Sequence, residues 1–405
     1  MVRILAQADG SRGHLVRPRE IASSSPRSLI PEPGWFALGV AQGVAAVFLL
    51  RRLLPGIHRV APVAPAPPIT DTTVSVIVPT LNEAHRLGPC LAGLQRQGPP
   101  LMEVIVVDGG SQDTTQALVE EAARRDHRIR FEREPPLPRG WIGKVWALQH
   151  GLSLARGEWV LGVDADTEAN EGLIAGVVAA ARAHGRQLVS FSPTFAGQTP
   201  WERWLQPALL MTLVYRTGAP GPTPSPDGLL ANGQCFLVRR DTLLEHGGYA
   251  PARASFADDV WLARHYAKAG VRAAFLDGRR LYRVRAYRSA GEMWREWGRS
   301  VDLADTTTSG RQWLDVLFLA LAQALPVPLL LLALVLPVPT AIVATNVLLL
   351  LVRFGLLAAV AGSYEQRGVP YVLSWLADPA AVWRVAASTW RRPVSWRGRD
   401  YHDLA

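Results

Sequence analysis

The 405-residue sequence has few cysteines and no cysteine pattern of a metal site. Its two cysteines, Cys90 and Cys235, provide neither a zinc-ligand spacing nor a disulfide framework, so we expect two buried thiols in a reducing compartment. The sequence also lacks a long lysine- or arginine-rich run, a zinc finger and an RNA-binding signature. These absences argue against nucleic acid as a partner.

The net charge is nevertheless positive. Lys and Arg number 43 against 34 Asp and Glu, which gives a formal charge of +9. In the absence of a nucleic-acid signature, this balance favours phosphorylated substrates or acidic lipid headgroups as partners.

Three uncharged, apolar runs predict an integral membrane protein. The first, in residues 35–54, predicts a transmembrane anchor, but its uncharged part is short for a span and the basic tail before it is also typical of a targeting peptide. Residues 316–362 predict a transmembrane hairpin, kinked at Pro326 and interrupted by Arg353. We expect Arg353 to be a snorkelling or helix-packing residue.

The distribution of charge predicts which side of the membrane the rest of the chain occupies. The turn within the hairpin has no charge, whereas the C-terminal tail is rich in arginine, so the tail and the soluble domain should face the cytoplasm. The expected regions are a basic tail (1–34), an anchor (35–54), a proline-rich linker (55–72), a soluble domain (73–310), the hairpin (316–362) and a basic cytoplasmic tail with an interfacial helix (363–405).

The soluble region alternates β-branched runs with helical patterns, which predicts an α/β fold with a doubly wound sheet. Strands are expected over 74–79, 102–107, 129–132 and 158–163. Ligands of such sheets bind beyond the carboxyl ends of the strands. Polar residues cluster there, at Asn82 and Glu83, at 108–113, and at Asp164 and Asp166.

Two acidic pairs carry candidate chemistry. Asp164 and Asp166 flank one alanine at a strand end, where two carboxylates can share a divalent cation, Mg²⁺ or Mn²⁺, although a solvated turn has the same pattern. Asp258 and Asp259 stand at the expected start of a helix, where aspartate is often only a cap. The residues alone leave both alternatives open.

Several motifs in order resemble the family-2 glycosyltransferases of the GT-A fold. They are VPTLNE (78–83), VDGGSQDT (107–114), Gly143-Lys144 followed by Gly151, the DAD turn (164–166), and Asp259 with Leu262. The resemblance covers residues 73–310 and implies a mixed, mainly parallel central sheet, to which the sequence adds two to three transmembrane helices.

The resemblance also implies the roles of the site residues. Asp259 would be the general base, with Asp258 beside it, and Asp164 and Asp166 would serve the metal. The residues implied to bind the nucleotide sugar, a GDP- or UDP-sugar, are Pro79, Thr80, Asn82, Glu83, Asp108, Gly109, Ser111, Lys144 and Asp164.

Longer stretches are similar to glycosyltransferases that act on carotenoids, in particular those that modify the 2′-hydroxyl of myxol, with fucose a common sugar. They are 138–151, 205–216, 231–237, 296–303 and 396–401. This similarity implies an inverting, single transfer to a lipid-soluble acceptor. The Gln-x-x-Arg-Trp sequence of processive synthases is replaced by 293–297, where only the tryptophan remains.

Tryptophans mark the expected acceptor side. Trp141, Trp294 and Trp297 are candidates to bind the acceptor, and residues 201–214 predict an interfacial helix or, alternatively, a buried core helix. Three rival functions fit less well. They are a transferase for another lipid (hopanoid, polyprenyl phosphate or glycolipid), a non-catalytic membrane scaffold, and a phosphoryl transferase, for which the phosphate-binding loop is missing.

Overall fold

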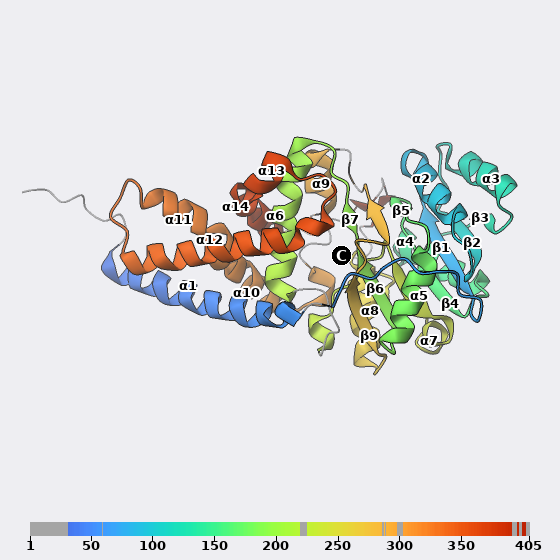
Figure 1. Ribbon diagram of the computed structural model, residues 1–405, viewed down its shortest axis with the longest axis horizontal. Coiled ribbons are helices and arrows are strands. Elements are labelled where there is room, and N and C mark those ends of the chain that lie inside the picture. The colour runs from blue at the N-terminus through green and yellow to red at the C-terminus, as the bar shows by residue number, and fades with distance from the viewer. Residues whose placement is uncertain are drawn as a thin grey trace, which may run out of the picture.

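The computed structural model describes residues 31–58, 60–218, 225–285, 287, 289–297, 303–390, 395–396 and 399–401. Two layers are visible in Figure 1: an α/β domain and, beside it, a group of helices drawn from both ends of the chain and from its middle. The central sheet of the α/β domain is mixed and mainly parallel, as predicted.

The central sheet has seven strands in the order β3-β2-β1-β4-β8-β6-β9. The four adjacent strands β3, β2, β1 and β4 are parallel to one another, and β6 is parallel to β9. Strand β8 runs antiparallel to both of its neighbours, β4 and β6. The strands span Val74–Thr80 (β1), Leu101–Asp108 (β2), Ile129–Arg133 (β3), Trp159–Gly162 (β4), Leu188–Ser192 (β6), Phe236–Arg239 (β8) and Ala273–Asp277 (β9). A second sheet, β5-β10-β7, joins Thr167–Ala169, Tyr282–Val284 and Thr194–Phe195.

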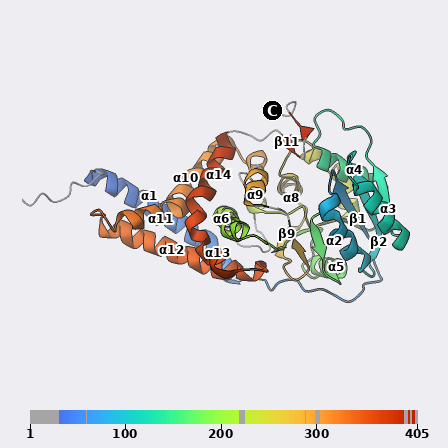
Figure 2. The same cartoon turned by 90° about the horizontal axis from the view of Figure 1, so that it is seen from above.

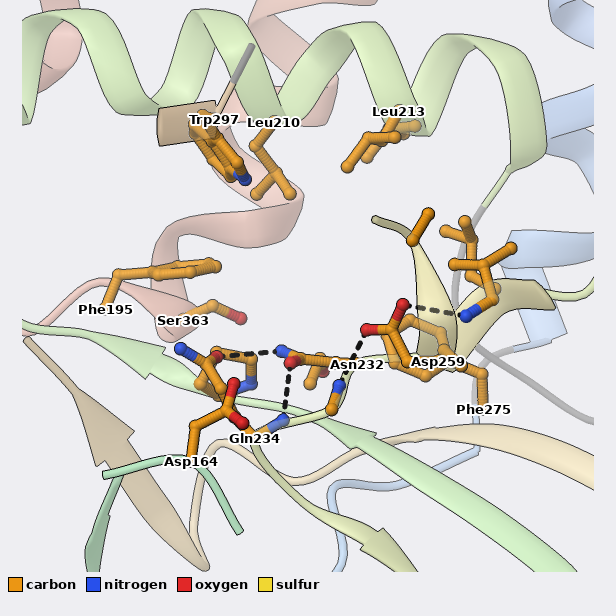
Figure 3. A pocket seen from close by; sticks show the side chains of 18 of the residues that line it. Asp164, Phe195, Leu210, Leu213, Asn232, Gln234, Asp259, Phe275, Trp297 and Ser363 are labelled. Carbon is orange, nitrogen blue, oxygen red and sulfur yellow. Dashed lines mark hydrogen bonds between the residues drawn. The ribbon is translucent and has the colours of Figure 1, made fainter. Parts of the chain in front are cut away.

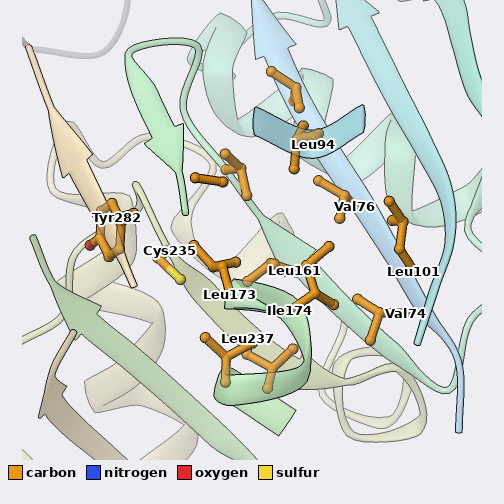
Figure 4. Close-up of a cluster of buried hydrophobic side chains, with 14 of the residues drawn as sticks. Val74, Val76, Leu94, Leu101, Leu161, Leu173, Ile174, Cys235, Leu237 and Tyr282 are labelled. Atoms are coloured by element: carbon orange, nitrogen blue, oxygen red, sulfur yellow. The ribbon is translucent and has the colours of Figure 1, made fainter. Parts of the chain in front are cut away.

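Helices cover both faces of the central sheet because its strands are apolar on both sides. One face packs on α2 (Ala84–Gln95), α3 (Thr115–Arg125) and α5 (Leu173–Ala183), and Figure 4 shows part of this core. The other packs on α4 (Gly143–Leu154) and α8 (Asp258–Lys268), with α7 (Arg240–Glu245) after β8. Both cysteines are buried and free, as predicted.

The proline-rich segment before β1 lies along the α/β domain. Its backbone amides at Val63, Ala66 and Ile69 donate to the carbonyls of Asp277, Gly172 and Pro99. The segment is therefore bound to the domain, which fixes the path from α1 (Glu32–Leu53) and η1 (Leu54–His58) to the sheet.

The helical layer combines segments that are far apart in sequence (Figure 1). The long helix α6 (Pro200–Thr217) packs against helices from both termini, and half of its apolar residues are buried, whereas Trp201 is exposed. The buried face of this helix supports the core-helix alternative for the segment. The remaining elements of the layer are α9 (Ala290–Trp297), η4 (Ala304–Thr306), α10 (Ser309–Leu319), η5 (Ala320–Ala324), α11 (Pro326–Leu332), α12 (Thr340–Val360), η6 (Ala361–Ser363), α13 (Gly368–Val372), η7 (Leu373–Ala377) and α14 (Asp378–Trp390).

Within the described residues, two helical stretches are long and apolar enough to cross a membrane, Glu32–Ile57 and Thr340–Ser363. A third would result if the pair Ser309–Ala324 and Pro326–Leu332, bent by 44°, forms one span. The bend falls before Pro326, where a kink was predicted, because proline cannot donate the backbone hydrogen bond of a continuous helix. These findings fit two to three transmembrane helices.

Arg353 is a packing residue. It is 2% exposed, and its Nε lies 2.8 Å from Oδ2 of Asp378 at the start of α14. Gln323 donates to the same carboxylate at 3.1 Å. The ion pair holds α12 and α14 together, so of the two expected roles, helix packing is observed and snorkelling is not.

Candidate active site

The turns that follow β1 and β2 are joined by hydrogen bonds. Thr80 and Asp108 are register partners at the ends of the two strands. The Asp108 carboxylate accepts from the backbone amides of Gly110 and Ser111, both at 2.9 Å, and the backbone of Gly109 donates to the Thr80 carbonyl. Asn82 accepts from the Gln112 amide. These predicted residues do come together, and Asp108 is fully buried as the anchor of its own turn.

The DAD turn after β4 is held by residues of two other segments. Lys144, in the first turn of α4, lies 3.0 Å from Oδ1 of Asp164. The Gln234 amide donates to both oxygens of Asp166, at 3.2 and 3.3 Å. Both aspartates therefore sit at the carboxyl end of the sheet, where they were expected.

The DAD turn suits a divalent cation that also binds a substrate. Mg²⁺ and similar ions are often held by one or two carboxylates together with substrate phosphates. No group of three or more Asp, Glu, His or Cys side chains forms a candidate metal site among the described residues, so a metal on Asp164 and Asp166 would need ligands from the substrate.

Asp258 and Asp259 are the first two residues of α8, and they line the same cavity as Asp164 and Asp166. The Asp259 carboxylate accepts from the amides of Gly233 at 2.7 Å and Val260 at 2.7 Å, which fixes its orientation. Asp258 lies 3.8 Å from Lys144 Nζ. The two acidic pairs predicted from separate parts of the sequence thus meet around one lysine.

The local charges shift the proton affinity of these groups. Burial raises the pKa of both Asp258 and Asp259, and the attraction of Lys144 opposes this shift without cancelling it. For Lys144, burial lowers the pKa, but the three surrounding aspartates outweigh burial and hold it above its ordinary value. The lysine is therefore charged, and the aspartate pair holds a proton more tightly than ordinary carboxyl groups do.

A cavity of about 560 Å³ connects these carboxylates with the helical layer (Figure 3). Asp164, Gln234, Asn232 and Asp259 lie on one side, and Leu210 and Leu213 of α6 lie opposite. Apolar side chains from six elements complete the far wall: Leu53, Ile57, Phe195, Val214, Trp297, Leu356 and Val360. One end of the cavity is thus acidic, and the wall of the other end is largely apolar.

The predicted site residues differ in their access to this cavity. Pro79, Glu83, Lys144, Asp164, Asp166, Asp258, Asp259 and Trp297 line it. Two predicted acceptor residues, Trp141 and Trp294, are not among the described residues that line it. Trp141 packs edge-on against Trp146, with ring centroids 5.1 Å apart, and Trp294 stacks with Arg384. Their rings are used for packing within the domain and the helical layer.

Sequence reasoning missed the role of residues 232–234. Gly233 donates to Asp259, and Gln234 to Asp166, so this loop bridges both acidic pairs. A Cβ on Gly233 would come within 2.8 Å of Lys144 Nζ, so a larger residue there would displace the lysine ammonium. The available signal was a short polar Asn-Gly-Gln run just before an apolar strand. Arg86 and Arg279 also line the cavity and were not predicted.

Comparisons with known proteins agree with this fold. Residues 75–247 match the family model "Glycosyl transferase family 2". A curated relative is the 4,4′-diaponeurosporenoate glycosyltransferase of Staphylococcus haemolyticus, 26% identical over 220 residues, which are 54% of this chain and 58% of that protein. Another is the GalNAc(5)-diNAcBac-PP-undecaprenol β-1,3-glucosyltransferase of Campylobacter jejuni, 33% identical over 25% of this chain and 32% of that protein.

A solved structure extends the similarity to the helical layer. The mannosyltransferase PcManGT from Pyrobaculum calidifontis, solved in complex with GDP-Man and Mn²⁺, has a TM-score of 0.54 and 21% identity, and the match covers 88% of this chain and 99% of that one. The chain spans a little over half the length of the staphylococcal relative and a third of the Campylobacter one. The α/β domain therefore has the GT-A fold that was predicted, and its residues 75–247 are similar to glycosyltransferase family 2, a family of enzymes.

Proposed function

We propose that the protein transfers a single sugar from a nucleotide-sugar donor to the hydroxyl of a membrane-soluble acceptor, with inversion at the anomeric carbon. The observation that carries this proposal is the cavity with two unlike ends. Its acidic end has the residues expected for sugar transfer, and its apolar end is built from helices suited to a membrane.

The donor belongs at the carboxyl ends of β1, β2 and β4. Thr80, Glu83 and Asp108 would hold the nucleoside, either directly or through their turns. Asp164 and Asp166 would hold Mg²⁺ or Mn²⁺, which neutralises charge on the departing diphosphate, and Lys144 adds a second positive charge there. The donor is proposed as a GDP- or UDP-sugar. The GDP-Man and Mn²⁺ bound to the Pyrobaculum enzyme support a nucleotide-sugar donor with a divalent metal.

Asp259 would take the proton of the acceptor hydroxyl. Its carboxylate is oriented by two backbone amides, it faces the cavity, and its raised pKa gives it more basicity than an ordinary aspartate. As the hydroxyl oxygen bonds to the anomeric carbon, the bond to the nucleoside diphosphate breaks on the opposite face. Asp258 would keep Lys144 and Asp259 in place.

The charge in the cavity favours a neutral acceptor. Among the described residues, seven carboxylates line it (Glu83, Asp164, Asp166, Asp258, Asp259, Asp277 and Glu296) against three cations (Arg86, Lys144 and Arg279). Even after a divalent metal and a diphosphate bind and compensate each other, a polyprenyl phosphate would meet net repulsion. A long apolar alcohol is the better fit.

Among neutral acceptors we propose a hydroxylated carotenoid, with the 2′-hydroxyl of myxol as the leading candidate and fucose as a candidate sugar. The staphylococcal relative, whose name refers to a substrate of carotenoid type, supports this class. A hopanoid or another glycolipid is the alternative. Only Trp297 of the three predicted tryptophans is in place to contact the acceptor.

The proposed location is the membrane, with the α/β domain on the cytoplasmic side. The two apolar helical stretches support membrane insertion, and the arginine-rich C-terminal region supports the orientation. Nucleotide sugars made in the cytoplasm would then reach the acidic end of the cavity from water, and the acceptor would enter from lipid.

The acceptor path is tested by filling its apolar wall. Leu213→Trp should raise the KM for a membrane-soluble acceptor at least severalfold, because the larger ring occupies the space opposite Asp259, and should leave the Kd for UDP or GDP unchanged. Leu314→Trp, at an exposed position of α10, is the control. Equal effects of the two variants on the acceptor KM would contradict the proposed path.

A further inference from the structure

The C-terminal end of the described chain returns to the α/β domain. After α14 leaves the helical layer, β11 (Ser395–Trp396) and β12 (Arg399–Asp400) form a two-stranded antiparallel pair. Figure 2 shows β11 beside the α/β domain, near α4 and away from α14. The last described residues therefore connect the helical layer to the nucleotide end of the site.

Arg399 bridges two loops at that end. One guanidinium nitrogen donates to the carbonyl oxygen of Gly109, the residue after Asp108, and the other lies 3.4 Å from Oε1 of Glu134, which follows β3. The Glu134 side chain is 5% exposed, and its Oε2 has no hydrogen-bond partner among the described residues. Arg399 thus compensates a buried carboxylate that still has one acceptor free.

Tyr401 holds the third segment. Its hydroxyl accepts from the backbone amide of Gly143, the residue before Lys144, at 3.1 Å. Its ring is buried against Phe256, with centroids 5.8 Å apart. A Cβ on Gly143 would come within 2.9 Å of Arg399 Nη1 and 3.2 Å of the Tyr401 hydroxyl, so the hairpin fits closely only over glycine.

We propose that Arg399 and Tyr401 are positioning residues of the donor site. This inference rests on the proposed function, because it takes the turn after Asp108 and the start of α4 to flank the nucleotide. Arg399 fixes the turn after Asp108, and Tyr401 fixes the start of α4. Together they set the spacing between the Gly109 turn and Lys144. The free oxygen of Glu134 offers an acceptor to an N–H or hydroxyl group of the nucleoside.

The contacts predict that donor binding depends on the hairpin and that the transfer step does not. Among the described residues, neither Arg399 nor Tyr401 lines the cavity that holds Asp259. Arginine is required at 399 because two separate nitrogens serve two partners, and the single ammonium of lysine cannot span both. Tyrosine is required at 401 only for its hydroxyl, since phenylalanine can keep the packing.

The test measures the Kd of UDP and GDP, with Mn²⁺ present, by titration calorimetry on the full-length protein. Arg399→Ala should weaken binding of the preferred nucleotide roughly tenfold or more, Arg399→Lys should recover only part of it, and Tyr401→Phe should weaken it severalfold. The donor KM should rise in parallel, with kcat and the acceptor KM unchanged. Arg367→Ala, an exposed arginine of the same C-terminal region, is the control.

The outcomes separate this inference from the proposed function. A wild-type protein that binds neither UDP nor GDP would overturn both. A wild-type protein that binds, with a Kd within twofold in Arg399→Lys and Tyr401→Phe, would overturn the role of the hairpin alone. An equal loss in kcat and in donor affinity would also overturn it, because a general fold defect would explain that result.

Discussion

At the scale of single residues, Gly233 and Gln234 hold the two acidic pairs in place, because each donates a hydrogen bond to one of them. Asp164, Asp166 and Asp259 were found because strand ends and short motifs are local features. Gln234 and Gly233 were not, because their role depends on β8 lying antiparallel beside β4, a pairing between segments far apart in sequence. The contacts of Trp141 with Trp146 and of Trp294 with Arg384 likewise depend on packing between segments and were not predictable from sequence.

Removal of the proposed base, Asp259, should abolish sugar transfer but leave the affinity for the nucleotide nearly unchanged. Asp259→Asn should lower kcat by roughly 10² to 10⁴, the usual contribution of a general base, because an amide cannot accept the proton of the acceptor. The Kd for UDP or GDP should stay within a few-fold. Asp241→Asn, at the surface near β8, is the control. Near-normal turnover of Asp259→Asn would refute the assignment.

The raised pKa of the aspartate pair predicts the pH profile. A carboxyl group with a raised pKa is neutral below that pKa and acts as a base only above it. The increase of kcat/KM with pH should therefore occur at pH values well above the ordinary aspartate pKa of about 3.9. The measurement is kcat/KM against pH at saturating metal. A profile already flat from about pH 4 upward would be inconsistent with a buried carboxylate base.

The DAD turn predicts metal dependence. Chelation by EDTA should abolish transfer, and added Mn²⁺ or Mg²⁺ should restore it, because two carboxylates and a diphosphate need a cation between them. Asp166→Asn should raise the metal concentration needed for half-maximal activity. Full activity in EDTA would show that Lys144 alone carries the leaving-group charge.

At the scale of elements, Gly151 of α4 is needed for the packing of this helix on strand β1 and not for the reaction. A Cβ on Gly151 would come within 2.5 Å of the Ile77 side chain on β1. Gly151→Ala should therefore cost about 1–3 kcal/mol of unfolding free energy, as overpacking of a core does. Gly88→Ala on α2, where nothing lies within 4 Å, should be neutral or stabilising. Equal melting temperatures of the two variants would contradict this packing.

In the helical layer, the buried ion pair between Arg353 and Asp378 should also contribute strongly to the free energy of unfolding. Arg353→Met should destabilise the protein by about 3–5 kcal/mol, because Asp378 would remain buried without its partner. Adding Asp378→Asn should recover part of that loss. The measurement is the denaturation midpoint in detergent. An unchanged midpoint in Arg353→Met would mean that the pair does not hold α12 to α14.

At the scale of the whole molecule, the α/β domain was predictable and the helical layer was only partly so. Alternating strand and helix patterns identify a doubly wound sheet without further information. Hydropathy located the apolar runs, but it cannot distinguish a helix that faces lipid from one that faces other helices. Hence the core position of α6, and the packing of α13 and α14 against it, became visible only in the structure.

The central claim is that one cavity joins nucleotide-sugar chemistry to a membrane-soluble acceptor. Its most direct test reconstitutes the full-length protein in vesicles that contain a hydroxylated carotenoid, adds GDP- and UDP-sugars with Mn²⁺, and identifies products by mass spectrometry. The account predicts a carotenoid or other lipid carrying one added sugar, absent with Asp259→Asn. Label found only in water-soluble products, or in lipids carrying long sugar chains, would contradict it.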